Sequence, residues 1–151
     1  MHLEAQVPDW DSYFMEIALI ASTRSKDLKT KVGTCIVKNK KVLSIGYNGA
    51  PRGFPDKDVP DSCDESLPYI EQKYPYMCHS ELNAILNFGG SLKELENSTL
   101  YATVSPCYEC AKAIIQVGIS RIIYKEEYHK KDVWEMSKFL LSKCGVEFYR
   151  L

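Results

Sequence analysis

The sequence predicts an α/β fold, a three-layer α/β/α sandwich built on one mixed five-stranded sheet, for two reasons. Helix-like and strand-like patterns of apolar residues alternate along the chain in the order α-β-β-α-β-α-β-α-β, which is typical of helices packed on the faces of a sheet. The polar run 38–41 joins the first two strands as an antiparallel hairpin. Helical crossovers then place the later strands parallel through right-handed connections.

The expected elements follow from local signals along the chain. Asp9 is a suitable cap for a first helix over residues 9–25, whose apolar residues recur at helical spacing. Strands over 32–37 and 42–47 form the hairpin. The later elements are a helix over 79–87, a strand over 98–104, a helix over 107–117, a strand over 121–124, a helix over 132–142 capped by Asp132, and a strand over 146–149.

We expect residues 1–151 to form a single domain, because the chain has no internal repeat, low-complexity tract or linker. Residues 50–76 form a long irregular insertion, and loops of this length in a compact domain are usually functional or disordered. Its acidic residues are either a solvated surface or a binding site for a metal–nucleotide complex.

Composition narrows the classes of function. Hydrophobic residues make up 45% of the chain, and no stretch approaches the length of a membrane span. The stretch 1–8 lacks the pattern of a signal peptide, so we expect a cytoplasmic protein whose six cysteines are reduced and available to a metal. The formal net charge of −1 argues against a large basic surface for nucleic acid.

Two short motifs carry the chemistry, His79-Ser80-Glu81 and Pro106-Cys107-Tyr108-Glu109-Cys110. Cys107 and Cys110 are spaced to lie on one face of a helix start, where unpaired N–H groups favour the thiolate form. Together with His79 they make three ligands for Zn²⁺ and leave a fourth position for water. Glu81 lies close enough to reach that water without being a ligand.

The alternative for these motifs is a structural zinc site. Cys78 or another side chain would then close the tetrahedron as a fourth protein ligand. The adjacent position of Cys78 and His79 speaks against this, since neighbouring residues rarely point at one ion from a helix start.

The chain resembles the cytidine deaminase superfamily over nearly its whole length, and within it the deoxycytidylate (dCMP) deaminases. His-x-Glu followed by Pro-Cys-x-x-Cys is the zinc deaminase signature. The narrower likeness is carried by the segments 24–27, 32–37, 46–49, 74–85 and 105–112. One departure is Ser80, where the family usually has alanine; we expect it to be tolerated.

The resemblance implies a cytidine-deaminase-like fold and the hydrolytic deamination of dCMP to dUMP, a step that supplies the precursor of dTMP. A zinc-activated water would attack C4 of cytosine. Glu81 would take the proton of that water, pass it to N3 and help protonate the leaving ammonia.

The resemblance also suggests residues for substrate recognition. Asn48 would bond the 3′-hydroxyl of the deoxyribose, with an asparagine that tolerates a strained turn as the alternative. Val32 would press on the base, or else belong to the core. Arg24, Ser25 and Lys26 would bind the 5′-phosphate, or else form a charged helix end. Tyr124 and Tyr128 would stack on the base, although a buried structural tyrosine is the expected role for either one.

Regulation is a further expectation. Many members are homohexamers activated by dCTP and inhibited by dTTP, and Gly46, Tyr47, Gly49 and Arg52 resemble the effector-binding region. Coupling would need a second site with differential contacts. We expect Mg²⁺ to accompany dCTP if it binds as an effector.

Other functions remain as alternatives. A deaminase of tRNA adenosine or polynucleotide cytidine would share the zinc chemistry but need a basic strand-binding groove. A free-nucleoside deaminase fits the long insertion poorly. A zinc-stabilised binding module without activity would have no need of Glu81.

Overall fold

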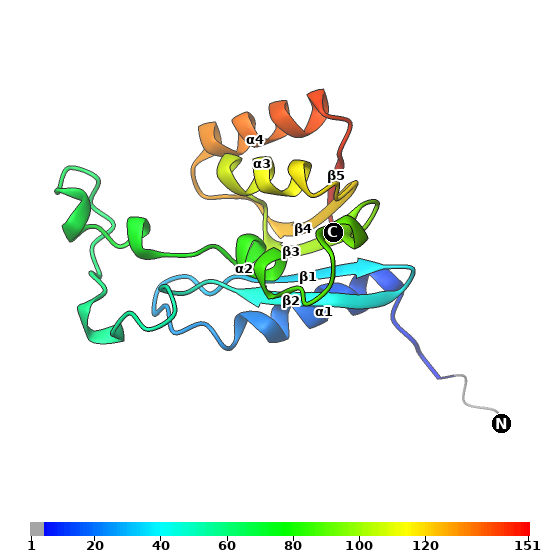
Figure 1. Cartoon of the computed structure of the whole chain (residues 1–151), viewed down its shortest axis with the longest axis horizontal. Coiled ribbons are helices and arrows are strands. Elements are labelled where there is room, and N and C mark those ends of the chain that lie inside the picture. Colours follow the sequence, from blue (N-terminus) through cyan, green and yellow to red (C-terminus); the bar gives the residue numbers. More distant parts are fainter. Residues whose placement is uncertain (1–4) are drawn as a thin grey trace.

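The computed structural model describes residues 5–151 (Figure 1). Met1–Glu4, half of the stretch that we expect not to be a signal peptide, therefore lie outside the described residues. Among residues 5–151, no helix has the length and apolar character needed to cross a membrane.

One mixed sheet forms the centre of the fold, with the strand order β2-β1-β3-β4-β5. β1 pairs antiparallel with both β2 and β3, whereas β3, β4 and β5 run parallel. This confirms the predicted hairpin and the parallel crossovers. The strands are β1 (Gly33–Lys38), β2 (Lys41–Tyr47), β3 (Thr99–Val104), β4 (Arg121–Glu126) and β5 (Glu147–Arg150).

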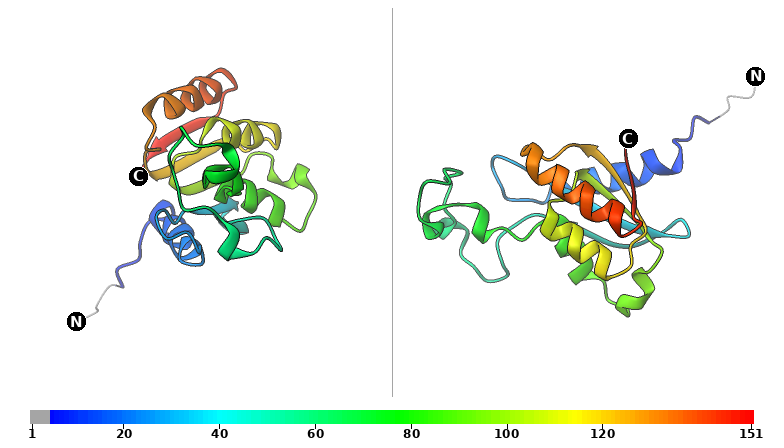
Figure 2. Two further views of the ribbon diagram at one scale, coloured as in Figure 1. Left: turned by 90° about the vertical axis from the view of Figure 1, so that its left-hand side faces the viewer. Right: turned by 90° about the horizontal axis from the view of Figure 1, so that it is seen from above.

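The helices cover both faces of this sheet, as the three-layer prediction requires (Figures 1 and 2). Helix α1 (Trp10–Ser22) packs on one face against Cys35 and Tyr101. The other face carries α2 (Ser80–Asn87), α3 (Tyr108–Gln116) and α4 (Lys131–Lys143). Residues next to Cys35 and Tyr101 in the sequence, such as Ile36 and Leu100, point to this second face because side chains alternate along a strand.

The boundaries of α1 and the hairpin have local causes. The Asp9 side chain accepts the backbone N–H of Ser12 at 2.9 Å, which confirms the predicted cap. The helix ends at Ser22, earlier than the predicted 25, and the Ser22 and Thr23 hydroxyls donate to carbonyls of the last turn at 2.6 Å. In the hairpin, Asn39 and Lys40 adopt φ values of 52° and 59°, which match the tight turn that paired strands favour.

The prediction that Asp132 caps α4 is wrong. Lys130 occupies the cap position and α4 begins at Lys131, so Asp132 already lies in the first helical turn. Its carboxylate accepts the adjacent backbone N–H of Val133 at 3.0 Å. An acidic side chain in the first turn also complements the positive end of the helix dipole, which is the same preference that suggested a cap.

The insertion over residues 50–76 extends from the body of the molecule between β2 and α2 (Figures 1 and 2). It contains three short 3₁₀ turns, Asp56–Asp58, Tyr69–Glu71 and Tyr74–Tyr76, and otherwise irregular backbone. At its end the chain returns to the body, where Gly49 and Cys78 exchange two backbone hydrogen bonds of 3.1 and 2.8 Å. The insertion therefore leads directly into the residues that begin α2.

Gly46 sets the distance between β2 and α2. A Cβ atom at this position would lie 2.4 Å from the backbone nitrogen of Ala84 and 2.5 Å from the carbonyl oxygen of Ser80. Both are atoms of the α2 backbone, which cannot yield as a flexible side chain would. The glycine is therefore a packing requirement of the fold.

We expect Gly46→Ala to lower the free energy of unfolding by about 1–3 kcal/mol, because the added methyl group must push α2 away from the sheet. Gly49→Ala is the matched control, since nothing lies within 4 Å of a Cβ atom there. Urea denaturation of both variants measures the difference. Equal stability of the two variants would contradict the packing role of Gly46.

Candidate active site

Three predicted metal ligands meet at the N-termini of two helices. His79 occupies the cap position of α2 and Cys107 that of α3, while Cys110 lies in the first turn of α3. The Nδ1 atom of His79 lies 3.3 Å from the sulfur of Cys107 and 3.5 Å from that of Cys110. The three ligand atoms lie within 4.8 Å of one another, a spacing that suits one tetrahedral ion.

The three side chains influence one another's ionisation. The hydrogen bond from Cys110, opposed by burial, lowers the pKa of Cys107 to about 4, and the same contact raises the pKa of Cys110. The hydrogen bond to Cys107 raises the pKa of His79 to about 9. Zn²⁺ binds thiolates and neutral imidazole, so metal binding would displace the protons that Cys110 and His79 hold in its absence.

The cluster contains three protein ligands. Within residues 5–151, no other group of three or more His, Cys, Asp or Glu side chains is arranged to hold a metal ion. Cys78, the candidate for closing a structural site, is not a member of this group. The donor set of one imidazole and two thiols with no fourth protein ligand is that of a catalytic zinc site.

Glu81 lies beside the cluster and is 4% exposed. Burial raises the pKa of its carboxyl group, against a lowering effect of His79. The Ser80 hydroxyl donates to Oε2 of Glu81 at 3.3 Å and lies 2.7 Å from the hydroxyl of Thr34. Ser80 is thus accommodated by a polar partner on β1, in agreement with its expected tolerance.

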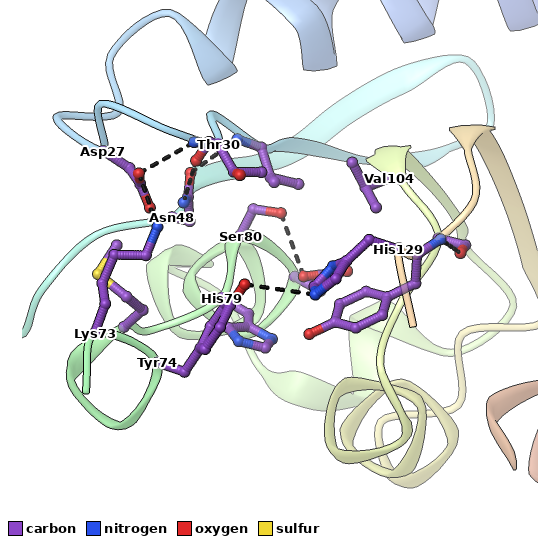
Figure 3. Close-up of a pocket in the computed structure, with 14 residues that line it drawn as sticks. Asp27, Thr30, Asn48, Lys73, Tyr74, His79, Ser80, Val104 and His129 are labelled. Atoms are coloured by element: carbon purple, nitrogen blue, oxygen red, sulfur yellow. Dashed lines mark hydrogen bonds and ion pairs between the residues drawn. The ribbon is translucent and has the colours of Figure 1, made fainter. Parts of the chain in front are cut away.

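A pocket opens in front of Glu81 and His79 (Figure 3). Its lining residues come from the segments before β1, after β2, around α2, after β3 and after β4. They are Asp27, Thr30, Val32, Asn48, Lys73, Tyr74, Met77, His79, Ser80, Glu81, Val104, Ser105, Tyr128 and His129.

Asn48 and Val32, two of the residues suggested for substrate binding, line this pocket. The Asn48 side chain accepts the backbone N–H of Val32 at 2.8 Å and donates to the carbonyl oxygen of Thr30 at 2.9 Å. Its backbone has no positive φ, so the alternative of a strained turn is wrong. The amide retains one N–H and one lone pair for a ligand.

The two suggested tyrosines have different positions. Tyr128 lines the pocket, and its ring stacks on His129 with centroids 4.7 Å apart. Tyr124 does not reach the pocket: it is 6% exposed and packs edge-on against Trp134 at 5.0 Å. Tyr124 points from β4 toward α4, whereas Tyr128 lies beyond the strand end where the chain turns across the pocket. A role for Tyr124 in base stacking is therefore wrong.

The structure does not gather Arg24, Ser25 and Lys26 at the pocket. The buried Ser25 hydroxyl donates to the backbone carbonyl of Asn48 at 2.9 Å. Arg24 and Lys26 are exposed and outside the pocket lining, and Lys26 pairs with Asp56 at 2.5 Å. Ser25 therefore has a structural role, and none of the three residues lines the pocket in front of Glu81.

The four residues suggested for effector binding are also dispersed. Gly46 is buried against α2, and the carbonyl of Tyr47 accepts the Asn83 side chain at 2.8 Å. Gly49 pairs with Cys78, and Arg52 is exposed on the insertion. These contacts give Gly46, Tyr47 and Gly49 roles in packing and backbone pairing. None of the contacts identifies a binding site for an effector nucleotide.

Sequence reasoning missed an ion pair in the pocket wall. The Lys73 ammonium lies 2.8 and 3.0 Å from the two carboxylate oxygens of Asp27, and both side chains are less than 10% exposed. It also missed His129, which stacks between Tyr74 and Tyr128. Nothing in the sequence indicates that Lys73 in the insertion and Asp27 before β1 are buried, because the two partners are far apart along the chain.

We expect Cys107→Ala to lose zinc, because only two ligands would remain. Cys144→Ser is the matched control, since Cys144 is exposed and lies outside the cluster. Metal analysis of the purified proteins should find about one zinc per chain in the control and much less in Cys107→Ala. Full zinc content in Cys107→Ala would contradict the ligand assignment.

Known proteins share this sequence and fold. Residues 8–126 match the family described as the cytidine and deoxycytidylate deaminase zinc-binding region. A probable deoxycytidylate deaminase of Drosophila melanogaster is 42% identical over 99% of this chain and 75% of its own length. The human deoxycytidylate deaminase is 40% identical over 93% of this chain and 78% of its own length.

Among solved structures, the dCMP deaminase of cyanophage S-TIM5, crystallised with dCMP and dUMP, superposes with a TM-score of 0.77. The two sequences are 30% identical, and the superposed region covers 97% of this chain and 100% of the phage chain. This likeness confirms the predicted cytidine-deaminase-like fold. Sequence and architecture therefore agree with the ancestry that the two short motifs indicate, and the chain belongs to the zinc-binding cytidine and deoxycytidylate deaminase family.

Proposed function

We propose that this protein is a zinc-dependent dCMP deaminase, which converts dCMP and water to dUMP and ammonia. The observation that carries the proposal is the buried Glu81 carboxyl group beside the three-ligand cluster, in the lining of a pocket that His79 also lines. The names of the related proteins support dCMP as the substrate, because they include deoxycytidylate deaminases from animals and phages.

Zinc bound by His79, Cys107 and Cys110 would supply a polarised water of pKa about 7. Glu81 would accept a proton from that water, protonate N3 of the cytosine and assist the departure of ammonia. Burial raises the pKa of the Glu81 carboxyl group, which suits a group that must both accept and donate a proton.

We also propose that the pocket walls hold the nucleoside. Asn48 would bond the deoxyribose with its remaining amide N–H, and Val32 and Tyr128 would contact the base. Their support is that all three line the pocket beside Glu81. The 5′-phosphate ligands are left open, because Arg24 and Lys26 lie outside the pocket lining.

Regulation and assembly stay predictions. A homohexamer controlled by dCTP and dTTP is expected from the family resemblance alone, as is a cytoplasmic location. Mg²⁺ with dCTP likewise stays a prediction; the acidic residues of the insertion form no group of three suited to an ion among residues 5–151. Asp56 and Glu65 instead pair with Lys26 and Lys130.

A substrate panel tests the proposed function. Ammonia release should be greatest with dCMP and much lower with cytidine, dCTP, a cytidine-containing oligonucleotide and a tRNA that carries the target adenosine. The physical reason is that the chain has no excess of basic residues to bind a polynucleotide, since its formal net charge is −1. Preference for a polynucleotide would overturn the proposal, and no activity on any substrate would favour a binding module.

We expect Glu81→Gln to lower kcat for dCMP by about a thousandfold or more, because the amide cannot accept the proton. Zinc content should stay near one per chain, since Glu81 is outside the ligand cluster. Glu109→Gln is the matched control, because Glu109 is exposed and pairs only with Lys112. Loss of zinc from Glu81→Gln would mean that the carboxylate is a ligand.

A further inference from the structure

The ion pair between Asp27 and Lys73 lies in the pocket wall and joins two parts of the chain. Asp27 belongs to the segment before β1, and Lys73 belongs to the returning end of the insertion. The Asp27 and Lys73 side chains are only 3% and 7% exposed. Figure 3 draws the pair at one end of the pocket, away from Val104 and His129.

Asp27 organises the first of these segments. Its carboxylate accepts the backbone N–H groups of Lys29 and Thr30 at 2.8 and 3.1 Å, in addition to the Lys73 ammonium. Burial opposes ionisation, but these hydrogen bonds outweigh it and lower the pKa of Asp27. The carbonyl of Thr30 in turn receives the Asn48 amide at 2.9 Å, so the carboxylate supports the segment that holds Asn48.

Lys73 organises the second segment. Its backbone N–H donates to the carbonyl oxygen of Ser62 at 2.8 Å, which closes the insertion on itself. The residues that follow, Tyr74 and Met77, line the pocket before the chain reaches His79. Lys73 is therefore the point at which the insertion is attached to the body of the protein by a buried charge.

The pair also separates two hollows. Asp27, Lys73 and Met77 line the pocket in front of Glu81 and also a neighbouring hollow under the insertion. The pair therefore belongs to the wall that the two hollows share. The zinc ligands are held separately, by the ends of α2 and α3.

We propose that Asp27 and Lys73 are positioning residues, a buried latch that holds the insertion against the substrate pocket. The latch completes the wall that binds substrate, whereas the metal cluster and Glu81 do not depend on it. Breaking it therefore weakens the binding of dCMP more than it slows the chemical step. The kinetic part of this inference rests on the proposed deamination of dCMP.

The test compares Lys73→Met, Asp27→Asn and the double variant. Each single variant leaves one buried group without its partner, so we expect KM for dCMP to rise roughly tenfold or more while kcat changes little. Because the two residues act as a pair, the double variant should have a KM no higher than the worse single variant. Additive effects on KM, or a fall in kcat at unchanged KM, would overturn the latch.

Asp56→Asn is the matched control. The Lys26–Asp56 pair joins the same two parts of the chain, but its side chains are 75% and 63% exposed, so its loss should leave KM unchanged. A KM increase in Asp56→Asn equal to that in Lys73→Met would mean that any link between these segments suffices, and would overturn a specific role for the buried pair.

A second readout does not depend on the substrate. Limited trypsin digestion should cleave after Arg52 or Lys57 faster in Lys73→Met and Asp27→Asn than in wild type, with zinc content unchanged. Unchanged proteolysis, or zinc loss in all three latch variants, would overturn the inference. If wild-type protein releases no ammonia from dCMP, the proposed function fails, and the proteolysis rates still decide whether the latch exists.

Discussion

The structure depends on the meeting of two helix N-termini at one point beside the sheet. His79 precedes α2 and Cys107 precedes α3, so these two predicted ligands occupy the cap positions of their helices, and Cys110 lies in the first turn of α3. A helix N-terminus carries unpaired N–H groups and a positive partial charge, which stabilise thiolates there. The same arrangement directs Glu81, in the first turn of α2, toward the metal cluster from the side. Fold and chemistry are therefore joined through two helix starts.

The close approach of α2 to β2 brings His79 to this point. Gly46 allows the helix backbone to lie against the strand, and the Ser44 hydroxyl donates to the carbonyl of Ala84 at 2.6 Å. On the opposite side, α3 follows β3 directly through Pro106, so the parallel strands set the place of Cys107. Gly46, Ser44 and the order of the strands thus set the positions of His79 and Cys107, although none of them belongs to the ligand cluster.

The sequence predicted some residues of the site and failed for others, and the reasons differ. His79, Cys107 and Cys110 could be proposed as ligands because Cys107 and Cys110 are three positions apart and because His-x-Glu followed by Pro-Cys-x-x-Cys is a known signature. Tyr124 could not be assigned, because a change of direction at the end of β4 separates it from Tyr128. The Arg24–Lys26 segment has the composition of a phosphate site, but Ser25 has a structural role and none of the three residues lines the pocket in front of Glu81.

By itself, the sequence determined the fold class and the order of the strands and helices along the chain. It also identified the three candidate ligands and the nearby Glu81. These depend on apolar periodicity and on short spacings, which are properties of neighbouring residues. Only the tertiary structure decided how the insertion closes the pocket, since Asp27 and Lys73 are 46 positions apart and each reads as an exposed charge until the other is placed beside it. A charged side chain is buried only where it has a partner, and the fold determines which residues that are distant along the chain come together.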